Sequence, residues 1–100
     1  MATVTNDLIN KAKLARRITT EAYDSQVADL LDAAFIDLGI AGVELPDTLD
    51  AICEQAAITY FMCNFGEPEN YDRLKASYDE QKAQLSMATG YTDWTVNHNA

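Results

Sequence analysis

The stretch TLDAICEQAAITYFMCNFGEPENYDRLKASYDEQKAQL, residues 48–85, decides the fold of this chain. In its first part, apolar side chains recur at i, i+3, i+4, i+7 and i+11, the spacing of one helix face: Leu49, Ile52, Cys53, Ala56 and Tyr60. From Ala57 onward the pattern is apolar nearly all round, since Ile58, Phe61, Met62 and Phe65 are added. Such a helix needs cover on both sides, either from its own subunit or from a neighbouring one.

A break separates this helix from a second one. Gly66 follows Phe65 as a C′ glycine, and Pro68 can open the next helix without losing a needed hydrogen bond. In the second arm, a 3-4 spacing joins Tyr71, Leu74, Tyr78, Gln81, Leu85 and Ala88. The pattern predicts helices over 48–65 and 68–88, packed as an antiparallel hairpin.

Two more helices precede the hairpin. A short one is predicted over 6–16, capped by Thr5 or Asn6, and a second over 25–38, capped by Asp24 or Ser25 and stopped by Gly39. The inner face of the second comprises Val27, Leu30, Leu31, Ala34 and Leu38, widened by Phe35 and Ile36. The chain is therefore predicted to be one all-α domain, residues 1–100: a small bundle of about four helices built on the hairpin, with an extended tail over 89–100.

An ordered set of pieces carries a family resemblance. These pieces are ARRITTEAYDSQVADLLDAAFIDLGIAGV, the ITYF helix closing with FG, the arm YDRLKASYDEQKAQL, and GYTDW. Together, over roughly residues 14–94, they resemble the head-tail connector (adaptor, or head completion) proteins of long-tailed bacteriophages. The resemblance implies an all-helical subunit that assembles into a ring, typically of twelve copies, beneath the portal of the capsid.

Charge is distributed unevenly along the chain. The net charge is −9, but residues 1–20 hold four bases against one acid, +3, while residues 21–100 hold three bases against fifteen acids, −12. Neutralising phosphates supplies most of the affinity for nucleic acid, so an acidic surface argues against tight binding. Genomic DNA that met this protein would pass without specific binding.

The sequence contains none of the common catalytic or cofactor motifs. It lacks a glycine-rich phosphate loop, a His beside a Ser or Cys nucleophile, and a CxxC pair, so no enzyme, cofactor or metal site is predicted. Cys53 and Cys63 lie ten residues apart on one predicted helix, about 15 Å, too far to bond to each other. They are typical of core thiols in a reducing compartment. With no apolar run of about 20 residues and no signal peptide, we expect no membrane contact and synthesis in the host cytoplasm.

Two groups of residues are candidate contact sites. The basic cluster Lys11, Lys13, Arg16 and Arg17 is either a solvated face or a contact with an acidic neighbour, in which case it would face Asp29 and Asp32 of the next subunit. In the tail, Tyr91 and Trp94 either dock on a partner such as the portal or fold back on their own subunit.

Two functions from different classes follow. The first is a structural virion protein of the neck, at the head-tail interface: a homo-oligomeric ring that binds the portal protein, joins the DNA-filled capsid to a tail-side neck or stopper protein, and lines the channel used in DNA packaging and exit. The alternative is a small acidic regulatory or inhibitory protein that binds another protein by mimicking the charge of DNA. Ring formation would favour the first, and a strict monomer that inhibits a nuclease would favour the second.

Overall fold

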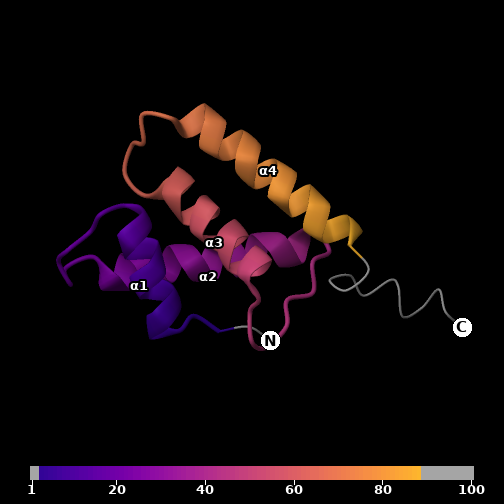
Figure 1. Ribbon diagram of the computed structural model, residues 1–100, viewed down its shortest axis with the longest axis horizontal. Coiled ribbons are helices and arrows are strands. Elements are labelled where there is room, and N and C mark those ends of the chain that lie inside the picture. Colours follow the sequence, from indigo (N-terminus) through magenta and orange to yellow (C-terminus); the bar gives the residue numbers. More distant parts are fainter. Residues whose placement is uncertain (1–2, 89–100) are drawn as a thin grey trace, which may run out of the picture.

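The computed structural model describes residues 3–88, and over these residues the chain forms four α-helices (Figure 1). They are α1 (Asn6–Ala15), α2 (Asp24–Ile40), α3 (Ala51–Asn64) and α4 (Tyr71–Met87). The prediction of a small all-α bundle is confirmed. The expected tail, 89–100, lies outside the described residues.

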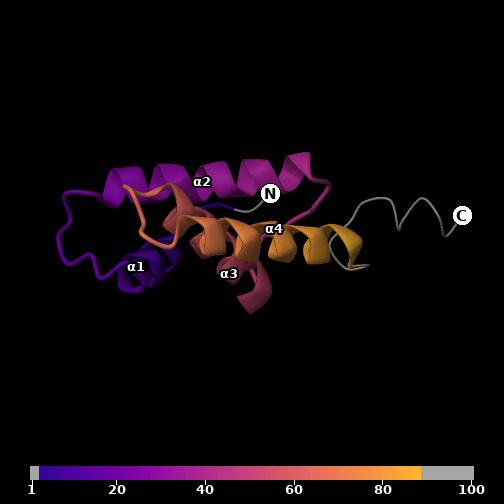
Figure 2. The ribbon, with the colours of Figure 1, turned by 90° about the horizontal axis from the view of Figure 1, so that it is seen from above.

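Helix α3 is the centre of the bundle. It packs against each of the other three helices, and α1 also contacts α2. Figure 1 shows α3 and α4 as the predicted antiparallel hairpin. In Figure 2, α2 runs along one side of the molecule, and α1 and the hairpin lie on the other. This arrangement covers the apolar second half of α3 from within one subunit.

The core consists of two clusters on either side of α3. One joins α1, α2 and α3 through Leu8, Ala12, Val27, Leu31, Ala34, Phe35, Ala57 and Phe61. The other joins the end of α2 and the following loop to α3 and α4 through Leu38, Val43, Cys53, Ala56, Cys63, Tyr78 and Leu85. Because α3 contributes to both clusters, removing any of its large buried side chains disturbs the packing of several helices at once.

Two isoleucines expected in the core are exposed. Ile52 is 58% exposed in the first turn of α3, and Ile36 of α2 is 55% exposed although its neighbour Phe35 is buried. Apolar periodicity gives a direction around a helix axis, but it does not tell whether another element reaches that direction at that level. Helix α2 is covered on the arc of Val27, Leu31 and Phe35 and left open on the arc of Ile36.

Three helix boundaries differ from the expected ones by two or three residues, and the others agree to within one residue. Helix α3 begins at Ala51 rather than 48, because Asp50 caps it by accepting a 3.0 Å hydrogen bond from Cys53 N. Helix α4 begins at Tyr71 rather than 68, and its ladder opens with Leu74 N bonded to Asn70 O at 3.0 Å. Helix α2 passes through Gly39 and ends at Ile40. The expected cap by Asp24 or Ser25 is wrong, because both residues lie inside α2 and its N-cap, Tyr23, makes no side-chain capping bond.

The ends of α1 and α2 share one hydrogen-bond pattern, the Schellman motif. After α2, Val43 N bonds to Leu38 O at 2.9 Å and Gly42 N bonds to Gly39 O at 3.0 Å, with Gly42 at φ +91°. After α1, Ile18 N bonds to Lys13 O at 2.8 Å and Arg17 N bonds to Leu14 O at 3.2 Å. Arg17 occupies the left-handed position of this second motif, at φ 57°.

Candidate functional site

The two lysines of the basic cluster form ion pairs inside the subunit. Lys11 Nζ lies 2.9 Å from Glu54 Oε1 of α3 and 3.2 Å from Asp7 Oδ2. Its hydrogen bonds, first to Glu54 and then to Asp7, raise the pKa of Lys11 above its ordinary value. Lys13 Nζ lies 2.7 Å from Asp24 Oδ1 at the start of α2. Both lysines therefore tie α1 to neighbouring helices of its own chain.

Arg16 is turned inward, onto the end of α3. Its guanidinium carbon lies 5.5 Å from the centroid of the Phe65 ring, and Nη1 donates to Met62 O at 3.5 Å. Met62 belongs to the last turn of α3, where carbonyls have no partner within the helix and a positive charge is favourable. Arg16 thus caps α3, and reversing its charge would disturb the fold as well as any contact between subunits.

Arg17 is the one member of the basic cluster that points away from the subunit. It is exposed, and among residues 3–88 it forms no ion pair. The left-handed backbone at this position lets Arg16 and Arg17, adjacent in sequence, leave the chain in different directions. Of the four bases expected at an interface, the structure leaves Arg17 available.

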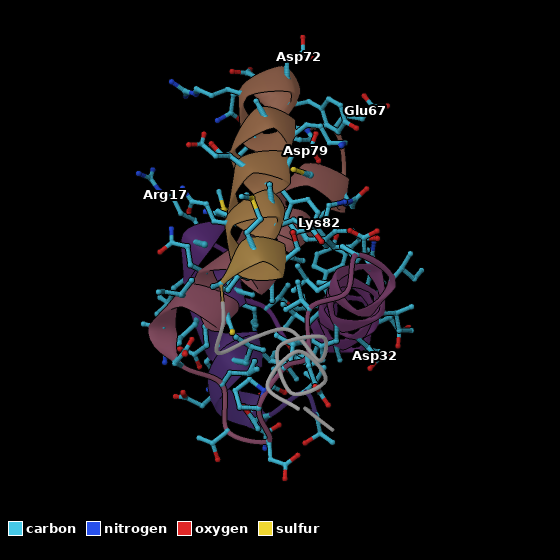
Figure 3. All side chains as sticks on the ribbon, turned by 90° about the vertical axis from the view of Figure 1, so that its right-hand side faces the viewer. Arg17, Asp32, Glu67, Asp72, Asp79 and Lys82 are labelled. Carbon is cyan, nitrogen blue, oxygen red and sulfur yellow. The ribbon has the colours of Figure 1, made fainter. Side chains whose placement is uncertain are left out.

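The acidic candidates lie on the opposite side of the molecule. Asp29 and Asp32 are exposed on α2, and Figure 3 places Asp32 at one side of the bundle and Arg17 at the other. The structure therefore does not bring the two candidate groups together within one subunit. A contact between them requires two copies of the chain.

Three exposed apolar side chains lie beside these charges; the sequence analysis missed Leu14 and Ile40 and assigned Ile36 to the inner face of α2. Leu14, at the end of α1, is 77% exposed, and on α2 Ile36 and Ile40 are 55% and 81% exposed. For α2 a signal was present in the sequence. Ile36 and Ile40 follow Asp32 by four and eight residues, which places them on the same outward-facing arc as the aspartates. Leu14 stood among polar residues and gave no such signal.

A polar network ties α4 to α2 away from these surfaces. Tyr78 Oη donates a 2.6 Å hydrogen bond to Asp37 Oδ2, and Lys82 Nζ donates to the same oxygen at 3.2 Å. Partial burial works to raise the pKa of Asp37, but the hydrogen bonds from Tyr78 and Lys82 outweigh it and hold that pKa below its ordinary value. The Tyr78 ring packs edge-on against Tyr60, with centroids 5.3 Å apart.

A cavity of about 130 Å³ opens beside this network, between α3 and α4. Two of its lining side chains, Lys75 and Lys82, each bond to a carboxylate, Asp79 at 2.7 Å and Asp37 at 3.2 Å. Their charges are thereby compensated within the protein. The network therefore serves to link α4 to α2.

Replacing Tyr78 by Phe is expected to lower the free energy of unfolding by about 1–2 kcal/mol, because a partly buried hydrogen bond to a charged acceptor is lost. The pKa of Asp37 in the folded state lies below its ordinary value of 3.8. The stabilisation that the Asp37 carboxylate gives the fold is therefore complete above pH 3.8 and is lost as the pH falls through the folded-state pKa. Urea unfolding at pH 7 and at low pH should show the difference between wild type and Tyr78→Phe shrinking in acid.

The matched control for this substitution is Tyr71→Phe. Tyr71 lies on the same helix, is 43% exposed, and has no hydrogen bond through its hydroxyl among the described residues. The substitution Tyr71→Phe should change the free energy of unfolding by less than about 0.5 kcal/mol at either pH. Equal losses for the two tyrosines, or a Tyr78 effect that does not depend on pH, would contradict the role given to Asp37.

Both cysteines are free and buried. Desolvation raises the pKa of Cys53 to about 12 and also raises the pKa of Cys63, so both stay protonated at neutral pH. Among residues 3–88, no three His, Cys, Asp or Glu side chains gather in a way that could hold a metal ion. Nor is any helix of this described part both long and apolar enough to span a bilayer. Tyr91 and Trp94 lie outside it.

The comparisons with known proteins add nothing to this geometry. No protein-family model, curated protein or solved structure matches the chain.

Proposed function

We propose that this chain is a structural virion protein of a long-tailed bacteriophage, a head-tail connector whose copies form a ring beneath the portal. The proposal combines the sequence resemblance with the four-helix subunit. In this role the protein is not an enzyme; it joins the DNA-filled capsid to a tail-side neck protein and forms part of the channel wall. Its site of action is the neck of the virion.

The observation that carries the proposal is the placement of unpaired charge. Arg17 lies on one side of the bundle and Asp32 on the other (Figure 3). Complementary groups on opposite sides of a subunit suit a heterologous contact, in which each copy presents a different surface to each of its two neighbours. Such contacts close into a ring when the rotation between copies divides a full turn.

The surplus of negative charge supports the channel role. Within the described residues the following carboxylates form no ion pair: Glu21, Asp29, Asp32, Glu44, Glu67, Glu69, Asp72 and Glu80. Figure 3 shows Glu67 and Asp72 together at the hairpin end of the molecule. A wall that carries unpaired carboxylates repels phosphates and lets DNA pass without binding.

The test is to add the purified chain to DNA-filled heads that lack it. We expect the heads to bind the protein and to become competent for tail joining. Trp94→Ala is expected to leave the melting temperature unchanged and to abolish joining, since large aromatic side chains commonly supply much of the affinity for a protein partner. Heads that neither bind the wild-type chain nor join tails would refute the connector role.

The same unpaired carboxylates favour a second candidate, a small acidic protein that mimics DNA and inhibits a DNA-binding protein. This candidate requires no ring. It would be supported by a chain that stays monomeric, fails to bind filled heads, and inhibits a nuclease in a salt-dependent manner.

A further inference from the structure

Arg17 occupies a backbone position that favours glycine. In the Schellman motif that ends α2, the left-handed residue is Gly42; in the same motif at the end of α1, it is Arg17, at φ 57°. A side chain with a Cβ is disfavoured in this conformation, and glycine is not. The chain thus keeps an arginine where the fold by itself would be better served by glycine, which points to a use for the side chain outside the subunit.

Leu14 completes a small surface with Arg17 that we call the α1 corner. Leu14 lies one turn before Arg17, and its carbonyl accepts the hydrogen bond from Arg17 N. It is 77% exposed. The corner therefore offers an arginine without an ion pair in residues 3–88 and an uncovered apolar side chain beside it.

The outward arc of α2 has the complementary composition, and we call it the α2 stripe: Asp29, Asp32, Ile36 and Ile40. All four side chains are exposed, on the arc opposite the buried Val27, Leu31 and Leu38. Helix α2 carries four aspartates and no lysine or arginine. Two of these aspartates, Asp24 and Asp37, pair with lysines of other helices, which leaves the two on the stripe unpaired.

We propose that the α1 corner of one copy docks on the α2 stripe of the next, with Arg17 paired to Asp29 or Asp32 and Leu14 packed against Ile36. This inference rests on the proposed function and names the surfaces that its ring would use. The occupant of the stripe is a second copy because the charges and apolar groups match in kind, acid to base and leucine to isoleucine. The two surfaces cannot meet within one chain, since Arg17 and Asp32 lie on opposite sides of it (Figure 3).

A disulfide trap in the full-length chain tests the contact while keeping both charges. In the variant Leu14→Cys with Ile36→Cys, mild oxidation should link copies head to tail and give a ladder of dimers, trimers and larger species that reducing agent collapses. The native Cys53 and Cys63 are buried and should not compete. The trap is applied to the concentrated protein and to the protein bound on filled heads.

The matched control is Leu14→Cys with Ile52→Cys. Ile52 is exposed to 58%, close to the 55% of Ile36, but it lies on α3 and outside the stripe. We expect no ladder from the control. Adding Arg17→Glu to the trap variant should abolish the ladder, and adding Asp29→Arg and Asp32→Arg as well should restore it.

Each outcome decides the contact. No ladder in either setting, a ladder equal to that of the control, or a ladder indifferent to Arg17→Glu would overturn it. A ladder from a chain that does not bind filled heads would leave the contact standing and remove the connector role. Binding to filled heads without a ladder would leave the connector role standing and remove the contact.

Discussion

Phe61→Ala is expected to lower the free energy of unfolding by about 3–5 kcal/mol, the usual cost of truncating a fully buried aromatic side chain. Phe61 is completely buried in α3, within the cluster that joins α1, α2 and α3, and its ring lies 5.1 Å from that of Phe65. Small domains have total stabilities of about 5–15 kcal/mol, so the loss would consume a large part of the whole. Urea denaturation followed by circular dichroism measures it.

The control for this truncation is Asp79→Ala on the outer face of α4. Asp79 forms an i, i+4 ion pair with Lys75 at 2.7 Å, and both side chains are about half exposed. Such pairs contribute less than about 1 kcal/mol. If Phe61→Ala and Asp79→Ala cost the same small amount, α3 would not be the centre of the core.

Arg17→Gly is expected to make the subunit more stable and unable to assemble. Glycine relieves the left-handed backbone at φ 57°, which should raise the free energy of unfolding by about 1 kcal/mol. The same change removes the guanidinium proposed to pair with the next copy, so larger species and binding to filled heads should be lost. Thermal melting and sedimentation of one preparation measure both effects.

Arg73→Gly serves as the opposite case. Like Arg17, Arg73 forms no ion pair among residues 3–88, but it lies within α4, where glycine costs about 1 kcal/mol. We expect this variant to lose stability and to keep assembly. An Arg17→Gly chain that assembles normally, or that is less stable than wild type, would contradict the account of this residue.

Features set by neighbouring residues were predictable from the sequence. Gly66 has the positive φ expected of a residue after a helix end, +64°, and Thr5 caps α1 by accepting a 3.1 Å hydrogen bond from Leu8 N. The start of α3 was misplaced because Asp47, Thr48 and Asp50 are all suitable caps within four residues. The choice among them depends on how the preceding loop packs.

Contacts between residues distant in sequence could not be predicted from the sequence. Arg16 and Met62 are 46 residues apart, and Lys11 and Glu54 are 43 apart. Nothing in the neighbouring residues distinguishes Lys11 and Arg16 from Arg17. All four bases were therefore predicted to form one surface. The fold divides them, because α1 lies against α3 and turns Arg16 onto its last turn. The proposed contact surface is correspondingly smaller than the sequence suggested, and it gains Leu14 and Ile36.

The mass of the assembled full-length chain tests the central claim, that copies associate head to tail into a closed ring. Native mass spectrometry of the concentrated protein, with negative-stain images of the same sample and of filled heads that have bound it, measures the copy number. The account predicts one closed species of many copies, seen as a ring with a central opening. A chain that remains monomeric in both settings, or that stops at a two-fold symmetric dimer, would contradict it.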